Sequence, residues 1–463
     1  MIKKILLISI LIILTGILIP FLSNWGIEEW WRLLLILGII IGLVILIFLY
    51  FKNPVFSLIL IPPSIIFGQI ATLRIQDWYY QISLAEILIL IITLFFVLHL
   101  IAKKQVLQIK FPLLLGCFLL YIFFSLLSLG WANNLSRAII ALRNLSFQFL
   151  TLFLVVNLIQ NKRDFKIALF SIPVTGFLVA SELIFKVISL GGFSGGYTLA
   201  RESIITPVGK WVYIAAIIIM TLPLTYILLL TNRNRWLKTF LFIETILGGI
   251  ATFLTLGKGE IFSLAGGFIY IFKKQRIKKI FAILLTCTLL VIIFIPLAAY
   301  SDQFLSRLTG IFTDPNTRFR IVEFQSAYQI FIQHPILGVG TGNLKLEYKN
   351  LLPWSVETES NNFFLQVLLE LGIIGFAVFL LLARAIYLEI RKAKMASINP
   401  EEKMLYVGFV STLIIVLLNS MVEATLIGLY YGIVFWYIVG LLVIYNQVNS
   451  KKLRFFLKPR KLN

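Results

Sequence analysis

Long apolar runs alternate with short polar segments along almost the whole chain. The runs recur at about 20 residues, which is enough for a helix to cross about 30 Å of hydrocarbon. They are continuously apolar, whereas the strands of a membrane barrel alternate between apolar and polar residues. The pattern predicts an all-α fold, a polytopic transmembrane helix bundle of about 14 spans, within a range of roughly 12–14.

Two of the predicted spans depart from a regular helix. The third contains Pro62 and Pro63, so it should be kinked or broken. The tenth is short for a span and is expected to be tilted. The predicted spans, in chain order, are 5–22, 33–51, 55–71, 84–101, 111–130, 139–159, 167–188, 212–230, 237–256, 261–272, 280–300, 363–382, 405–421 and 426–445.

The basic residues predict the orientation of the bundle. With the N-terminus in the cytoplasm, the inside segments hold 28 of the 41 Lys and Arg and only 4 of the 20 acids. This is the distribution that the positive-inside rule produces, so the net charge of +21 reflects topology and we expect no nucleic acid partner. We predict a multi-pass protein of the plasma (inner) membrane with both termini cytoplasmic and a basic cytoplasmic tail at 446–463.

One long hydrophilic segment, residues 300–362, interrupts the apolar pattern. The same orientation places it outside the cytoplasm, as a long extracytoplasmic loop. It lies within a C-terminal transmembrane region at 201–445, which follows N-terminal transmembrane helices at 1–200. A loop of this length without a function is uncommon.

The extracytoplasmic loop should carry its own short helices. Helical spacing from Arg320 to Gln333 predicts a helix that ends before Pro335. The helix is expected to be amphipathic and to lie at the membrane surface over the bundle. Its predicted apolar face comprises Ile321, Phe324, Ala327, Tyr328 and Phe331, and a tight turn follows at Gly338, Gly340 and Gly342.

Several cations are expected at one depth, near the outer face. Charges at a membrane are costly and are candidates for function, although each alone could be a snorkelling or paired residue. Together they match the depth of a diphosphate on a lipid carrier, since arginine binds phosphate oxygens in pairs and lysine supplies a point charge. The candidate diphosphate-binding residues are Arg201, Lys210, Lys258, Arg318 and Arg320.

Two motifs carry a family resemblance. Arg320, Phe324 and Ala327, followed by the run from His334 to Asn343 (HPILGVGTGN), form the first. The second opens the next helix as NFFLQ at 362–366 and ELGIIG at 370–375. These motifs resemble the O-antigen ligase/polymerase family. The resemblance covers roughly residues 200–440 and is most specific at 318–375.

The resemblance implies a membrane glycosyltransferase. Such an enzyme takes a glycan from undecaprenyl diphosphate at the outer face and transfers it to an acceptor hydroxyl, without a metal or other cofactor. A ligase uses lipid A–core as its acceptor and builds lipopolysaccharide; a polymerase uses another lipid-linked repeat unit. Implied partners are the lipid-linked glycan donor, a glycan or lipid acceptor, the bilayer, and other polysaccharide-assembly proteins. Arg320, and Arg201 with it, would bind the diphosphate and stabilise the leaving charge.

The chain departs from the family pattern at two positions. Family ligases usually have a histidine, proposed as the base, where this chain has Asn361, and an arginine is common where it has Lys258. The missing histidine favours a polymerase slightly over a ligase. Glu357 and Glu359 are the nearest carboxylates and are candidate general bases. The candidate catalytic residues are therefore Arg320, Glu357, Glu359 and Asn361; His334 and Glu370 are expected to be structural, with Glu370 packed on a polar partner.

Two other functions remain open. A lipid-linked oligosaccharide flippase or other transporter can have a similar number of spans, but such proteins tend to show two similar halves. No internal repeat is visible here, and the polar residues gather in one loop. A non-enzymatic assembly partner of a polysaccharide system is the third alternative. The sugar, the linkage and the acceptor are left open.

Overall fold

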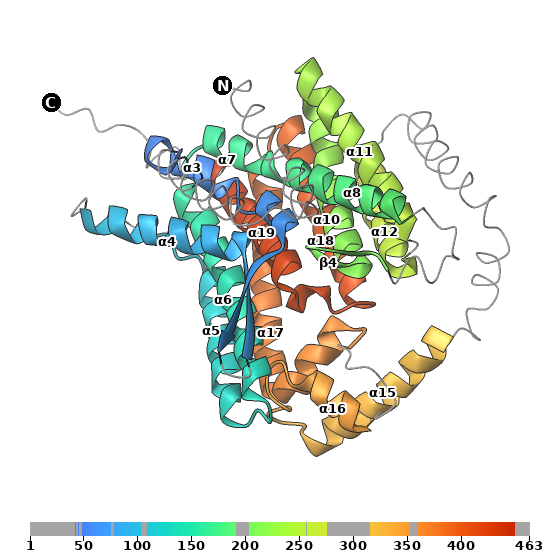
Figure 1. The fold of residues 1–463 in the computed structure, drawn as a ribbon. Coiled ribbons are helices and arrows are strands. Elements are labelled where there is room, and N and C mark those ends of the chain that lie inside the picture. The colour runs from blue at the N-terminus through green and yellow to red at the C-terminus, as the bar shows by residue number, and fades with distance from the viewer. Residues whose placement is uncertain are drawn as a thin grey trace, which may run out of the picture.

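A computed structural model describes residues 49–75, 78–102, 109–190, 203–255, 257–275, 315–351 and 360–449, together with Gly42 and Ile45. Figure 1 shows a helical bundle with α15 and α16 at one end. The predicted spans at 5–22 and 280–300, most of the span at 33–51, and the predicted tail lie outside the described residues.

The first half of the chain supplies two hairpins as well as helices. Its elements are α3 (Pro54–Leu58), η1 (Pro63–Phe67), β1 (Gln69–Ile75), β2 (Trp78–Ser83), α4 (Leu84–Ala102), α5 (Leu113–Leu127), η2 (Ser128–Gly130), α6 (Leu135–Leu158), α7 (Lys162–Leu169), α8 (Ser171–Ser189), β3 (Ile205–Thr206), β4 (Gly209–Lys210) and α10 (Trp211–Thr231). Both strand pairs, β1 with β2 and β3 with β4, are antiparallel.

In the second half of the chain, every regular element among the described residues is a helix. Its elements are α11 (Arg235–Thr255), α12 (Lys258–Gln275), α15 (Pro315–Gln333), α16 (Leu344–Leu351), α17 (Phe363–Ala396), α18 (Pro400–Ser420), η3 (Thr425–Ile427) and α19 (Leu429–Asn449). Asn134 and Asn362 begin α6 and α17, because each side chain accepts a hydrogen bond from a backbone N–H three residues on.

Within the described residues, nine helical segments are long and apolar enough to cross a membrane. This confirms a polytopic helical membrane protein. Each segment overlaps one predicted span. They are Leu84–Ile101, Leu113–Gly130, Leu135–Leu158, Lys162–Ser189, Trp211–Thr231, Arg235–Thr255, Phe363–Ala396, Pro400–Ser420 and Leu429–Asn449.

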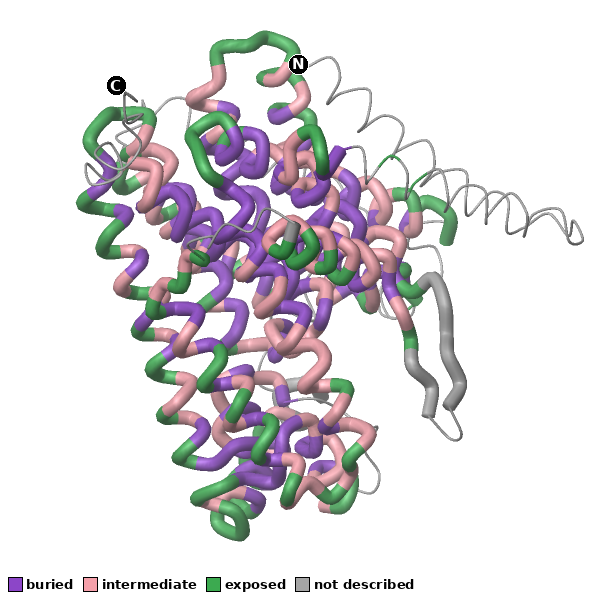
Figure 2. The backbone as a smooth tube through the Cα atoms, turned by 90° about the vertical axis from the view of Figure 1, so that its left-hand side faces the viewer, coloured by how far each residue is buried: buried purple, intermediate pink, exposed green. Residues whose placement is uncertain are grey.

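The centre of the bundle is formed by α10 and α19, which are the most buried of these segments. Figure 2 shows buried residues running through the interior of the bundle. Gly440 lets α19 approach Val155 of α6 closely. The buried amide of Gln148 on α6 accepts from Trp436 Nε1 at 3.2 Å and donates to the carbonyl oxygen of Gly428 at 3.3 Å. Its polar atoms are thereby paired inside the apolar core.

The third predicted span is broken, as Pro62 and Pro63 indicated, but it does not continue as a helix to residue 71. The chain forms α3 and η1, turns at Gly68 with φ +50°, and enters strand β1. Strand β1 pairs with β2 in a register that sets Leu73 opposite Tyr80. The predicted helical end at 69–71 was therefore wrong, because backbone pairing with β2 replaces the helical hydrogen bonds there.

The tenth predicted span is longer than expected. Helix α12 covers Lys258–Gln275, 18 residues, where the apolar run alone covered 261–272. The polar residues at both ends of α12 extend the helix beyond its apolar part.

The loop helix forms as predicted, but it turns a different face to the protein. Helix α15 ends at Gln333, before Pro335 as predicted. Two residues of the predicted apolar face, Ile321 and Phe324, are however 56% and 57% exposed. From Arg320 onward, where side chains are described, the buried residues of α15 are Glu323, Ser326, Ala327 and Ile330. A carboxylate and a hydroxyl are therefore buried in place of part of the apolar stripe. The placement of this stripe on a membrane surface stays a prediction.

Candidate functional site

The two sequence motifs bind each other through their backbones. The glycine turn at 338–342 lies against a break in α17 at Gly372, whose φ is +64°. At the break, the carbonyl oxygens of Leu369 and Glu370 accept from the N–H groups of Val339 and Gly340, at 3.0 and 2.8 Å. In return, Ile373 N–H donates to the carbonyl oxygen of Pro335 at 3.0 Å. The break therefore leaves these helical groups paired with the turn.

The glycine turn needs its glycines. Gly338, Gly340 and Gly342 all have positive φ, at +69°, +90° and +69°, which confirms the predicted tight turn. A β-carbon at Gly340 would lie 2.8 Å from the side chain of Ala132, just before α6. Thr341 N–H also donates to Ser128 Oγ at 3.1 Å. The turn is thus held between α17 and the connection from α5 to α6.

The side chain of Arg320 extends from α15 to the connection between α18 and η3. Its Nη2 lies 3.4 Å from the carbonyl oxygen of Val422 and 3.6 Å from Glu423 Oε1. The Arg320 side chain is 38% exposed, so the ion pair is weak and an anion can compete with Glu423. The start of α17 joins the same connection, because Asn362 Nδ2 donates to the carbonyl oxygen of Met421 at 3.2 Å.

Lys258 begins α12 beside the same connection. A β-carbon at the next residue, Gly259, would lie 3.2 Å from the Val422 side chain. The Lys258 side chain is exposed. The structure therefore brings Arg320 and the residue after Lys258 to one segment, 421–423, from helices far apart in the sequence.

The remaining predicted cations and bases are placed only in part. Lys210 is exposed in β4, next to the start of α10. Arg318 lies in the first turns of α15, but only its backbone position is described. Arg201, Glu357 and Glu359 lie outside the described residues.

Asn361 holds a carboxylate that the sequence analysis did not single out. Its backbone N–H donates to Glu323 Oε1 at 2.7 Å, and its Nδ2 donates to Glu323 Oε2 at 2.6 Å. Glu323 is buried, and so is Tyr348 nearby on α16. Burial and then the charge of Glu323 raise the pKa of the Tyr348 hydroxyl, which therefore stays protonated over the physiological range.

Hydrogen bonds continue from this cluster into the bundle. Ser360 N–H donates to Gln366 Oε1 at 3.1 Å, and Gln366 Nε2 donates to Glu370 Oε1 at 2.9 Å. The polar partner expected for Glu370 is thus Gln366. Both side chains line a cavity of about 320 Å³ between α5, α6, α17, α18 and α19.

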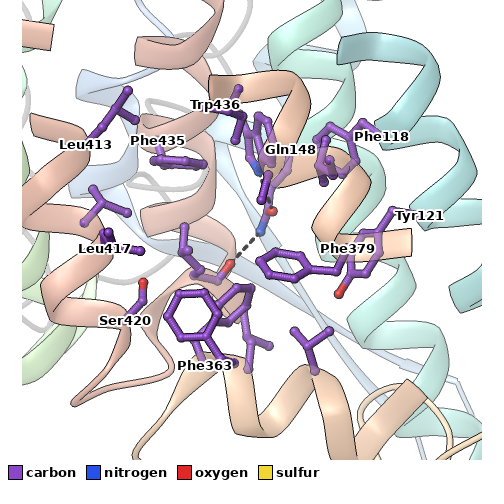
Figure 3. A pocket seen from close by; sticks show the side chains of 18 of the residues that line it. Phe118, Tyr121, Gln148, Phe363, Phe379, Leu413, Leu417, Ser420, Phe435 and Trp436 are labelled. Carbon is purple, nitrogen blue, oxygen red and sulfur yellow. Dashed lines mark hydrogen bonds between the residues drawn. The ribbon is translucent and has the colours of Figure 1, made fainter. Parts of the chain in front are cut away.

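The cavity is almost entirely apolar and aromatic. Figure 3 shows the rings of Phe118, Tyr121, Phe363, Phe379, Phe435 and Trp436 around it. Leu417 of α18 and Tyr387 of α17 also line it, and both side chains are exposed. One part of the cavity reaches Phe363 and Ser420, the residues adjoining Asn362 and Met421. An apolar chamber therefore borders the connection that Arg320 contacts.

A known protein family matches the segment that contains α12, α15, α16 and the start of α17. The model of the family described as O-Antigen ligase matches residues 243–380. This segment is similar to the O-antigen ligase family. The match confirms the family resemblance and spans Lys258, Arg320 and Asn361, as well as both motifs. No curated protein matches the chain. The O-antigen ligase domain supports an O-antigen ligase-type function in polysaccharide biosynthesis.

The matched segment also contains Glu323, which the sequence analysis missed. Its buried position was hidden by the apolar periodicity of α15, which pointed to a different face that shares Ala327 with the buried one. The available signal was spacing: Glu323 follows Arg320 by three residues and therefore lies on a neighbouring part of the same helix surface. Glu423 lies outside the matched segment and at the end of a span, where a single acid gives little signal.

Proposed function

We propose that this protein transfers a glycan from undecaprenyl diphosphate to an acceptor hydroxyl at the outer face of the plasma membrane. The observation that carries the proposal is the apolar cavity that borders the Arg320 contact at residues 421–423. A donor with an apolar tail and a diphosphate head needs these two surfaces next to each other. The O-antigen ligase domain supports the same reaction class.

The cavity is suited to part of a polyprenyl tail. Its volume of about 320 Å³ falls at the lower end of the range for ligand pockets. A longer tail would continue between α17 and α18, where Leu417 and Tyr387 are exposed. The tail would enter from bilayer hydrocarbon and not from water, so packing against the aromatic side chains of the cavity would hold it.

Arg320 would bind the diphosphate and stabilise its charge as the glycan leaves. An arginine can donate two hydrogen bonds to phosphate oxygens, and removal of one such donor typically costs about 10²–10³ in rate. Lys258, beside the same connection, would add a second positive charge. Arg201, Lys210 and Arg318 are further candidates for the same diphosphate. No metal or other cofactor is required in this scheme.

We favour a polymerase over a ligase, because Asn361 stands where a ligase of this family has its histidine. A chromosomal deletion read out on a glycan gel tests the choice. Loss of ladder length with one repeat still attached indicates a polymerase. Loss of all attached glycan, with lipid-linked polymer accumulating, indicates a ligase. An unchanged glycan pattern would contradict the proposed function.

A further inference from the structure

Glu323 is positioned like a reactive carboxylate. The side chain is only 4% exposed, and Asn361 donates one hydrogen bond to each of its oxygens. Both contacts are donated by the backbone N–H and the side-chain amide of one residue, so they hold the plane of the Glu323 carboxyl group. Because each oxygen has a second lone pair, one more donor, such as a substrate hydroxyl, can bind at the same time.

Glu323 and Arg320 lie one turn apart on α15, about 4.5 Å along the helix axis. Arg320 contacts Val422 and Glu423, while Asn361 precedes Asn362, which contacts Met421. The carboxylate and the cation therefore approach the start of α17 and the connection 421–423 from one helix. A reaction at this place would have the Glu323 carboxylate to accept a proton and the Arg320 guanidinium to bind an anion, next to each other.

We propose that Glu323 is the general base of the transfer reaction and that Asn361 is the residue that positions it. This inference rests on the proposed function and gives Glu323 the role that sequence alone assigned to Glu357 and Glu359. The proton of the acceptor hydroxyl passes to a Glu323 oxygen while the acceptor oxygen bonds to the anomeric carbon. The bond from that carbon to the diphosphate oxygen breaks, and its electron pair leaves with undecaprenyl diphosphate beside Arg320.

The partners of Glu323 fit this role. Tyr348 stays protonated beside it and therefore adds no negative charge next to the Glu323 carboxyl group. Ser360, the residue before Asn361, donates its backbone N–H to Gln366, and Gln366 in turn donates to Glu370. Asn361 is thereby fixed on both sides, and its amide keeps the Glu323 carboxylate in one orientation.

Rescue by azide distinguishes a general base from a carboxylate that has only a structural role. It is a nucleophile that needs no deprotonation, so it can replace the acceptor hydroxyl when the base is missing. Purified wild-type protein, Glu323→Ala and Glu323→Asp are incubated with lipid-linked glycan extracted from deletion cells, with and without sodium azide. Release of undecaprenyl diphosphate and formation of glycosyl azide are followed by mass spectrometry.

Glu323→Ala should lose transfer to the hydroxyl acceptor by about 10²–10⁴-fold, the usual contribution of a general base. Azide should restore donor cleavage in this variant and give the glycosyl azide. Glu323→Asp should keep partial transfer. Arg320→Ala should stay inactive with azide, because its loss affects the leaving group.

Normal acceptor transfer by Glu323→Ala would overturn the proposal. So would a Glu323→Ala protein that is monodisperse and binds the lipid-linked glycan but gives no azide product. If Glu323→Ala does not fold, Glu323→Gln is judged by the same two outcomes. Wild-type protein that releases no undecaprenyl diphosphate would instead contradict the proposed function itself.

Discussion

A β-carbon at Gly372 would lie 2.2 Å from the carbonyl oxygen of Ile336. The glycine turn and the break in α17 therefore fit together only without a side chain at this position. Gly372→Ala should destabilise the protein, because the new methyl group clashes and the positive φ is strained, at a cost of about 1–3 kcal/mol. Thermal unfolding in detergent, followed by fluorescence, measures the change.

Gly130→Ala is the matched control for this substitution. Nothing lies within 4 Å of the position of its β-carbon, so its unfolding temperature should stay near that of the wild type. Equal unfolding temperatures for Gly372→Ala and wild type would show that the turn does not depend on close approach at residue 372.

Replacement of Arg320 tests the diphosphate contact. Arg320→Ala should lower the rate of glycan transfer by about 10²–10³, whereas Arg320→Lys should keep part of it, since lysine retains the charge and loses the paired hydrogen bonds. The rate is measured in membranes with equal amounts of each protein. Lys349→Ala, an exposed cation on α16, should transfer normally. Normal transfer by Arg320→Ala would exclude the contact.

Removal of the carboxylate of Glu423 should strengthen donor binding. Glu423 Oε1 lies 3.6 Å from Arg320 Nη2, so under the proposed function it would compete with phosphate for this arginine, while the carbonyl oxygen of Val422 would still hold the arginine in place. An exposed ion pair contributes up to about 1 kcal/mol, so Glu423→Gln should lower the donor KM by about two- to fivefold. Steady-state kinetics check this. A raised KM would mean that Glu423 orients Arg320 for the donor.

A bulky residue in the cavity should select against long carriers. Leu413→Trp narrows the cavity beside Phe435, so the KM for an undecaprenyl donor should rise by about tenfold or more. A donor with a tail of only two isoprene units should be affected much less. Leu94→Trp, on the exposed side of α4, is the control. An equal rise for both donors would argue against tail binding in the cavity.

The sequence predicted those parts of the fold that depend on one local signal. Apolar length located the helical spans, and Pro62 and Pro63 predicted the break between α3 and η1. Gly338, Gly340 and Gly342 predicted the turn, and all three adopt the positive φ that glycine permits. Strand β1 was missed because it is stabilised by backbone pairing with β2, and the length of an apolar run carries no information about such pairing.

The candidate site was harder to predict because it depends on contacts between distant segments. Arg320 was recognised as a cation, yet its partners Val422 and Glu423 lie about a hundred residues away. Glu323 was overlooked because a carboxylate on a buried face contradicts the apolar rule; the two hydrogen bonds from Asn361 offset its burial. The periodicity of the sequence predicts neither the contacts of Arg320 nor the hydrogen bonds between Asn361 and Glu323.

The part of the protein beyond the bundle has a hydrophobic core of its own. Ala327 and Ile330 of α15, Val339 of the turn, Leu344 and Tyr348 of α16, and Leu369 of α17 form one cluster, separate from the main core. The first part of α17, up to Gly372, thus contributes to the loop's packing as well as to the bundle. Evolutionary exchange or laboratory grafting of the loop should therefore succeed only when residues 315–375 are transferred as one cassette. A splice at the start of α17, where the apolar pattern resumes, would divide a folding unit.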